Sequence, residues 1–129
     1  MTKKKRKETI DLVVEVFQEY PGSMLVDYLR DGACLQATVE EDKFALEKSD
    51  GILLISPGEL EFPDITVWLN KAACEYLAAA EVPQDFVTRT RECIRGTHKP
   101  CLMTYEINAS VTRMLMKGYL DFVRKLGLI

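Results

Sequence analysis

The sequence predicts an α+β domain in which helices cover one face of a five-stranded antiparallel sheet. Apolar and polar residues alternate over 33–40 and again over 63–70, which is the period of a half-buried strand. Asp50-Gly51 and Pro57-Gly58 are tight-turn signals between strand-like runs, and strands joined by tight turns pair antiparallel. Such a sheet usually has one face on the core, so we expect the helices to gather on that face.

Two helices are predicted before the sheet. Residues 8–19 place Ile10, Val13 and Phe17 at helical spacing, and Pro21-Gly22-Ser23 ends this first helix. Ser23 is a candidate cap for a short second helix over residues 24–30.

Four strands follow along the chain. The first covers 33–40, and the next two, 43–48 and 52–56, form a hairpin around Asp50-Gly51. The fourth strand covers 63–70, where Pro63 stands at the start and costs the least hydrogen bonding.

Helical spacing returns after the fourth strand. Asn70 is a candidate cap for a helix that reaches Ala80. A further helix spans 83–95, with Pro83 in its first turn and Gly96 as its C-cap. Residues 101–107 form the fifth strand, and Asn108 is expected to cap one closing helix.

The closing helix is apolar over an unusually wide arc. At about 100° per residue, one face is Val111, Leu115, Tyr119, Phe122 and Leu126. The arc is widened by Met114, Met116, Leu120 and Val123. A surface helix needs an apolar stripe of about 100° or a little more. Two hypotheses explain the surplus. Either the helix is wedged between two surfaces or forms a dimer interface, or it is a lid over an apolar cavity.

Length and charge narrow the class of protein. With 129 residues we expect a single domain over 8–129, preceded by a disordered basic tail over 1–7. The net charge is −3 although the tail is strongly basic, so the body is acidic and nucleic acid is an unsuitable partner. The tail is suited at most to weak contact with an anionic membrane. With no signal peptide or membrane-length apolar run, we expect a cytoplasmic protein.

We find no catalytic motif in the sequence and expect no enzyme. Cys93, His98 and Cys101 form a C-x4-H-x2-C pattern that could bind zinc with Cys74 or Cys34, but this spacing matches no zinc template. We therefore expect no metal site and unbridged thiols.

A second candidate site is basic. Arg89, Arg91, Arg95, His98 and Lys99 could receive an anionic head group. They also suit a solvated helix flank, since arginines are favourable near a helix C-terminus.

Two segments resemble the sterol carrier protein family of lipid-transfer domains. They are GILLISPGELEFPDITVWLNKAACEYLAAA (51–80), with its Pro63–Asn70 strand, and CLMTYEINASVTRMLMKGYLDFVRKLGLI (101–129). The likeness covers about residues 25–129.

The resemblance implies a function and a set of site residues. It implies an apolar tunnel between sheet and helices, of about 300 Å³ or more, closed by the C-terminal helix and holding a fatty acyl, sterol-like or isoprenoid lipid without a cofactor. The alternative is a dimerisation or protein-interaction module. The residues expected to line the tunnel are Val67, Leu69, Tyr76, Phe86, Met103, Met114, Leu115, Met116, Tyr119, Leu120 and Val123.

Overall fold

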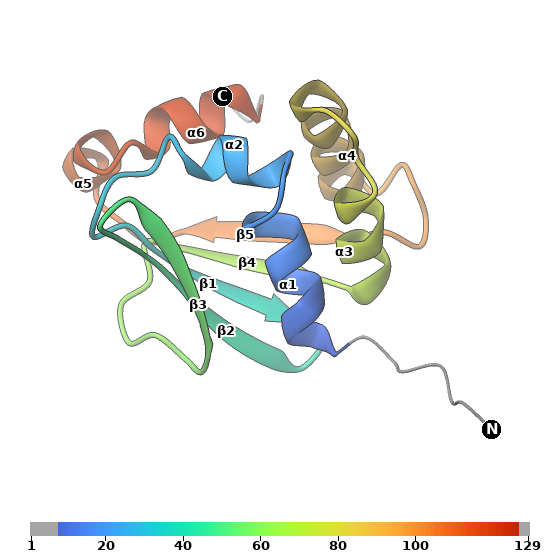
Figure 1. The fold of residues 1–129 in the computed structure, drawn as a ribbon, viewed down its shortest axis with the longest axis horizontal. Coiled ribbons are helices and arrows are strands. Elements are labelled where there is room, and N and C mark those ends of the chain that lie inside the picture. The colour runs from blue at the N-terminus through green and yellow to red at the C-terminus, as the bar shows by residue number, and fades with distance from the viewer. Residues whose placement is uncertain (1–7, 127–129) are drawn as a thin grey trace.

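A computed structural model describes residues 8–126 of the chain. The expected basic tail and the terminal residues 127–129 lie outside this range. The elements, shown in Figure 1, are α1 (Thr9–Phe17), α2 (Gly22–Val26), β1 (Cys34–Val39), β2 (Asp42–Ser49), β3 (Ile52–Pro57), β4 (Ile65–Leu69), α3 (Lys71–Ala78), α4 (Pro83–Arg95), β5 (Met103–Ile107), α5 (Val111–Met116) and α6 (Tyr119–Lys125).

The α+β class and the five strands are confirmed, but the prediction of a purely antiparallel sheet is wrong. The strand order is β3-β2-β1-β4-β5, and β1 pairs with β4 in parallel, with Leu35 opposite Ile65. The pairs β1–β2, β2–β3 and β4–β5 are antiparallel. Tight turns force antiparallel pairing only between the strands that they join, and no tight turn joins β1 to β4.

The segment 58–64 explains the parallel pair. It carries the chain from β3, at one edge, past β2 and β1 to the start of β4. The side chain of Gln36 in β1 donates a 3.0 Å hydrogen bond to the Gly58 carbonyl and accepts one of 2.5 Å from the Leu60 N–H. Gln36 is therefore buried, although its place in the alternating pattern of β1 is on the face away from the core. This segment covers part of the sheet face that the helices leave open.

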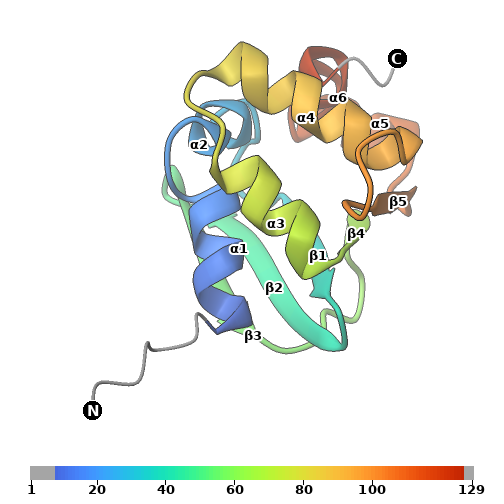
Figure 2. The same cartoon turned by 90° about the vertical axis from the view of Figure 1, so that its right-hand side faces the viewer.

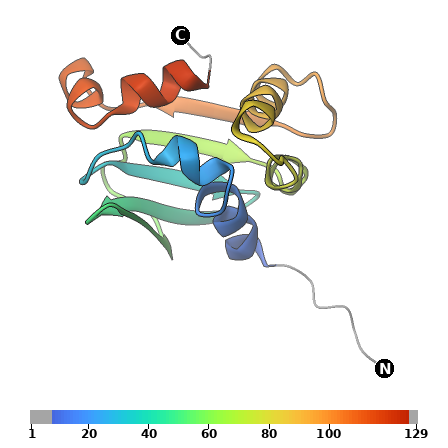
Figure 3. The ribbon, with the colours of Figure 1, turned by 45° about the horizontal axis from the view of Figure 1, so that its top comes forward.

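The helices lie over the other face of the sheet. In Figure 2, α1 and α3 lie side by side across it, and α1 packs on α3. Val13 and Val16 of α1 and Leu77 of α3 are fully buried against the sheet layer. Figures 1 and 3 show α3 and α5 at opposite ends of the sheet. No helix among residues 8–126 is long and apolar enough to cross a membrane.

Several predicted caps and turns are confirmed. The Asn70 side chain accepts a 2.9 Å hydrogen bond from the Ala73 N–H at the start of α3. Pro83 begins α4, and Gly96 ends it in the left-handed region. Asp50 and Gly51 have φ of 51° and 76°, as a tight hairpin turn requires.

The prediction of one closing helix capped by Asn108 is wrong. Ser110 caps α5 by accepting a hydrogen bond from the Arg113 N–H, and the chain then breaks at Gly118, where φ is 81°. A Cβ atom on Gly118 would lie 2.0 Å from the Tyr28 carbonyl oxygen. The helix ends there because the chain must pass this close to the backbone that follows α2, which only glycine permits.

Candidate ligand-binding site

An apolar cavity of about 50 Å³ lies between the sheet and the helix layer. Both layers contribute side chains to it. Its lining is Val16, Phe17, Gly22, Leu25, Val26, Leu35, Ala37, Leu46, Ile65, Val67, Leu77, Phe86, Thr90, Met103, Tyr105, Phe122, Val123 and Leu126.

The lining offers few polar groups to a ligand. Thr90 and Tyr105 are its polar side chains, and the Thr90 hydroxyl donates a 2.8 Å hydrogen bond to the Phe86 carbonyl of its own helix. The cavity is therefore suited to an apolar group that needs no hydrogen bonds from its surroundings.

The cavity is much smaller than the expected tunnel. Pockets that bury small molecules usually measure about 300 Å³ or more, whereas about 50 Å³ holds little beyond one water molecule. Side chains fill most of the space between the layers in this structure. A lipid could occupy it only if the helices moved away from the sheet.

Four of the residues expected to line the tunnel do line this cavity: Val67, Phe86, Met103 and Val123. The other seven lie elsewhere. Leu69 is buried in the core near the end of β4, and Tyr76 is half-buried on the surface of α3. Tyr119 is fully buried, but its hydroxyl is bonded to Asp64.

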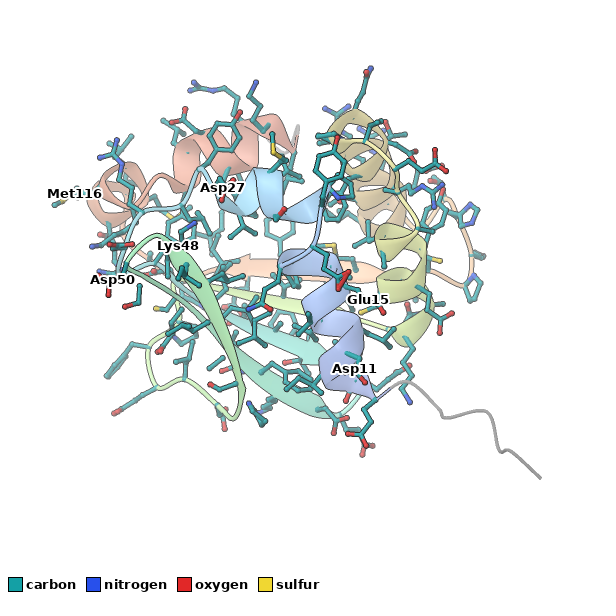
Figure 4. All side chains as sticks on the ribbon, viewed as in Figure 1. Asp11, Glu15, Asp27, Lys48, Asp50 and Met116 are labelled. Carbon is teal, nitrogen blue, oxygen red and sulfur yellow. The ribbon has the colours of Figure 1, made fainter. Side chains whose placement is uncertain are left out.

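The other four belong to the C-terminal helices. Leu120 and Met114 are half-buried, and Leu115 and Met116 are 54% and 63% exposed. Figure 4 shows Met116 at the far end of α5, pointing away from the protein. No residue of α5 lines the cavity, because the break at Gly118 turns α6 rather than α5 over the sheet.

Sequence reasoning missed other lining residues. Phe122 and Leu126 lay on the predicted apolar face of the closing helix, so a signal for them existed. Leu25 falls on the inward side of the second helix expected over residues 24–30, so it too had a signal, whereas Val26 of α2 had none.

A buried polar cluster around Asp64 holds the C-terminal helices in place. Asp64 is 3% exposed and accepts hydrogen bonds from the Cys34 N–H (3.1 Å), the Tyr119 hydroxyl (2.8 Å), and the Arg113 Nη2 (3.2 Å) and Nε. Arg113 also donates a 2.9 Å hydrogen bond to the Gly32 carbonyl. The cluster therefore joins α5 and α6 to the starts of β1 and β4, and it positions α6 over the cavity.

The ionisation of this cluster suits a structural role. Burial opposes the charge on Asp64, but hydrogen bonds from Arg113 and Tyr119 outweigh it and lower the pKa of Asp64. Burial, followed by the hydrogen bond to Asp64, raises the pKa of Tyr119 well above its usual range. Asp64 is thus a charged acceptor and Tyr119 a neutral donor near neutral pH.

The C-x4-H-x2-C residues do not converge on one point. The ring of His98 stacks on Tyr76, with centroids 4.0 Å apart, while Cys93 is fully buried. Within residues 8–126, no group of three His, Cys, Asp or Glu side chains could hold a metal ion. All four cysteines are free thiols. Burial is the main cause that raises the pKa values of Cys74 and Cys93 to about 12.

The fold is that of a sterol carrier protein-like domain. A solved structure described as "UbiJ-SCP2 Ubiquinone synthesis protein" matches it with a TM-score of 0.51 and 11% sequence identity, over 92% of each chain. No protein-family profile matches the sequence, and no curated protein matches it. At this identity the comparison shows a common fold, in agreement with the resemblance noted in the sequence.

Proposed function

We propose that this protein binds a lipid-like ligand between its sheet and its helix layer, without making or breaking a bond. The observation that carries the proposal is the apolar cavity, to which the sheet and five of the six helices within residues 8–126 contribute. The sterol carrier protein-like fold supports it. The ligand class is a fatty acyl, sterol-like or isoprenoid lipid. Ubiquinone carries an isoprenoid tail, so the description of the similar structure favours a ligand of this kind.

The proposed binding step requires the cavity to grow. Removing apolar ligand surface from water provides about 25 cal/mol per Å², which can offset the cost of parting helices that pack on the sheet. The short helix α2 is suited to move, because few of its residues contact the sheet, whereas the hydrogen bond between Tyr119 and Asp64 holds the start of α6 in place.

A groove on the outer surface marks the proposed route of access. It measures about 350 Å³ and is lined by Met24, Leu25, Tyr28, Pro83, Gln84, Val87 and Lys125, from α2, α4 and α6. Leu25 lines both this groove and the cavity. The Arg91 Nε spans the gap between α4 and α6 with a 3.0 Å hydrogen bond to the Leu126 carbonyl.

A second candidate function is protein interaction or dimerisation through α5. Val111, Leu115 and Met116 are 77%, 54% and 63% exposed, on one short helix at the end of the sheet. Apolar side chains exposed together in this way favour an interface. This function needs no cavity.

Three measurements on the purified 129-residue chain test both proposals. They are native mass spectrometry, extraction and identification of bound lipid, and titration with a neutral fluorescent dye such as Nile red. Lipid binding predicts a co-purified lipid, or saturable dye binding by the lipid-free protein. A stable dimer with neither lipid nor saturable dye binding would support the interaction module and contradict the lipid proposal.

A further inference from the structure

Lys48 is a buried cation on the cavity side of the sheet. It lies in β2 on the same face as Phe44 and Leu46, and its side chain is only 5% exposed. Its Nζ donates a 3.3 Å hydrogen bond to the Val26 carbonyl, at the end of α2, and lies 3.7 Å from the Oδ1 of Asp27. Figure 4 shows Lys48 and Asp27 close to each other, away from Asp11 and Glu15 of α1.

Lys48 is not itself part of the cavity lining, but its ammonium group lies next to Val26, which is. Leu46 lines the cavity, and Lys48 follows it on the same face of β2, about 7 Å further along the strand. Val26, whose carbonyl accepts the Lys48 hydrogen bond, lines the cavity too. A chain lying in the cavity could therefore end within reach of the Lys48 ammonium.

The charge of Lys48 is only partly compensated. A lysine ammonium has three N–H donors, and the hydrogen bond to Val26 uses one of them. Asp27 is 71% exposed, so its carboxylate is largely solvated and its attraction is weakened by water. A buried ammonium is stable only when it is paired. A neutral side chain with an N–H or O–H donor would make the hydrogen bond to the Val26 carbonyl equally well. This hydrogen bond therefore does not explain why the residue at position 48 is positively charged.

We propose that Lys48 binds the anionic head group, a carboxylate or a phosphate, of a ligand whose apolar tail occupies the cavity. The head group would take the place of Asp27 beside the Lys48 ammonium. This inference rests on the proposed lipid-binding function and adds the ligand's charge, its orientation and the residue that recognises it.

The test compares three ligands with the same sixteen-carbon chain: the fatty acid, the alkyl phosphate and the neutral alcohol. The affinity of each ligand is measured by its displacement of Nile red from the wild-type protein. The same measurement is made on the variants Lys48→Met, Lys48→Arg and Asp27→Asn. We expect the wild type to bind one of the anions at least about tenfold more tightly than the alcohol, since a hydrogen bond to a charged group is of this strength. The preferred anion distinguishes a carboxylate site from a phosphate site.

The variants separate recognition from stability. Lys48→Met should lose the preference for the anion and keep its affinity for the alcohol, while Lys48→Arg should keep the preference. Asp27→Asn should bind the anion a few-fold more tightly, because a competing carboxylate is removed.

Equal affinity of the wild type for the anions and the alcohol would overturn the inference, and this comparison needs no folded variant. Equal weakening of all three ligands in Lys48→Met would overturn it too, and would indicate a structural lysine. If neither Nile red nor any of the three ligands binds, the proposed lipid function itself fails.

Discussion

The Tyr119 hydroxyl donates a 2.8 Å hydrogen bond to the Oδ2 of Asp64, across 55 residues of sequence. Both side chains are buried, and Arg113 binds the same carboxylate. The bond ties α6 to the start of β4, and it fixes the helix that closes the cavity.

Tyr119→Phe is expected to destabilise the fold by about 1–3 kcal/mol, because the buried Asp64 carboxylate loses a donor. Urea unfolding measures the change. The matched control is Tyr20→Phe, which removes the same hydroxyl from a 58% exposed side chain and should be nearly neutral. Equal effects of the two substitutions would show that the Asp64 bond contributes nothing.

The low pKa of Asp64 predicts a pH dependence of stability. Hydrogen bonds from Arg113 and Tyr119 hold the pKa below its usual 3.8 in the folded protein, although burial opposes them. The unfolded chain thus takes up the proton first as pH falls. The stabilisation is fully present above about pH 4 and is lost as pH falls through the folded pKa.

Comparison with Asp64→Asn isolates this dependence. The wild type should exceed the variant in unfolding free energy at about pH 6, and the difference should shrink at about pH 3. A difference that stays constant between the two pH values would contradict the assigned pKa direction.

Gly118→Ala should be more damaging than Gly51→Ala. Both glycines have positive φ, 81° and 76°, which costs a side chain about 1–2 kcal/mol. Gly51 has open space around it, whereas a Cβ on Gly118 would meet the Tyr28 carbonyl oxygen. Thermal unfolding of the two variants separates the two costs. Gly51→Ala measures the cost of positive φ alone, and the additional loss in Gly118→Ala measures the clash with Tyr28. Equal losses would mean that the close approach of the chains is unimportant.

Filling the cavity should weaken ligand binding. Ala37→Val adds two carbon atoms to the lining from β1, and the affinity for Nile red should fall several-fold while the protein stays folded. The control is Thr104→Val, which places the same residue at an exposed position of β5. If Ala37→Val binds the dye as tightly as the control does, the ligand lies outside this cavity.

The thiols are expected to be unreactive and metal-free in the folded protein. With pKa values raised to about 12, chiefly by burial, Cys74 and Cys93 have almost no thiolate at about pH 8. Iodoacetamide should leave both unmodified until denaturant is added, as peptide mass spectrometry will show. Rapid native alkylation of Cys93, or stoichiometric zinc by elemental analysis, would contradict this prediction.

The sequence by itself determined the α+β class, the number of strands and most of the local boundaries. Asn70, Pro83, Gly96 and Asp50-Gly51 act within a few residues of the chain, so their caps and turns could be predicted from neighbours alone. The resemblance to the sterol carrier protein family also led to Val67, Phe86 and Met103, which line the cavity.

Only the tertiary structure decided how these elements meet. The parallel β1–β4 pair depends on the route of residues 58–64, which is fixed by the bonds of Gln36 and has no periodic signal. The break at Gly118 depends on Tyr28, a residue 90 positions earlier, so the helical pattern of the last segment ran on through it. In the sequence, Lys48 is indistinguishable from an exposed polar residue of a strand. Its burial beside Val26 arises only when α2 packs over β2. Local sequence patterns depend only on residues that are neighbours along the chain. The cavity and the charge of Lys48 near it both depend on contacts between segments that are far apart in the sequence.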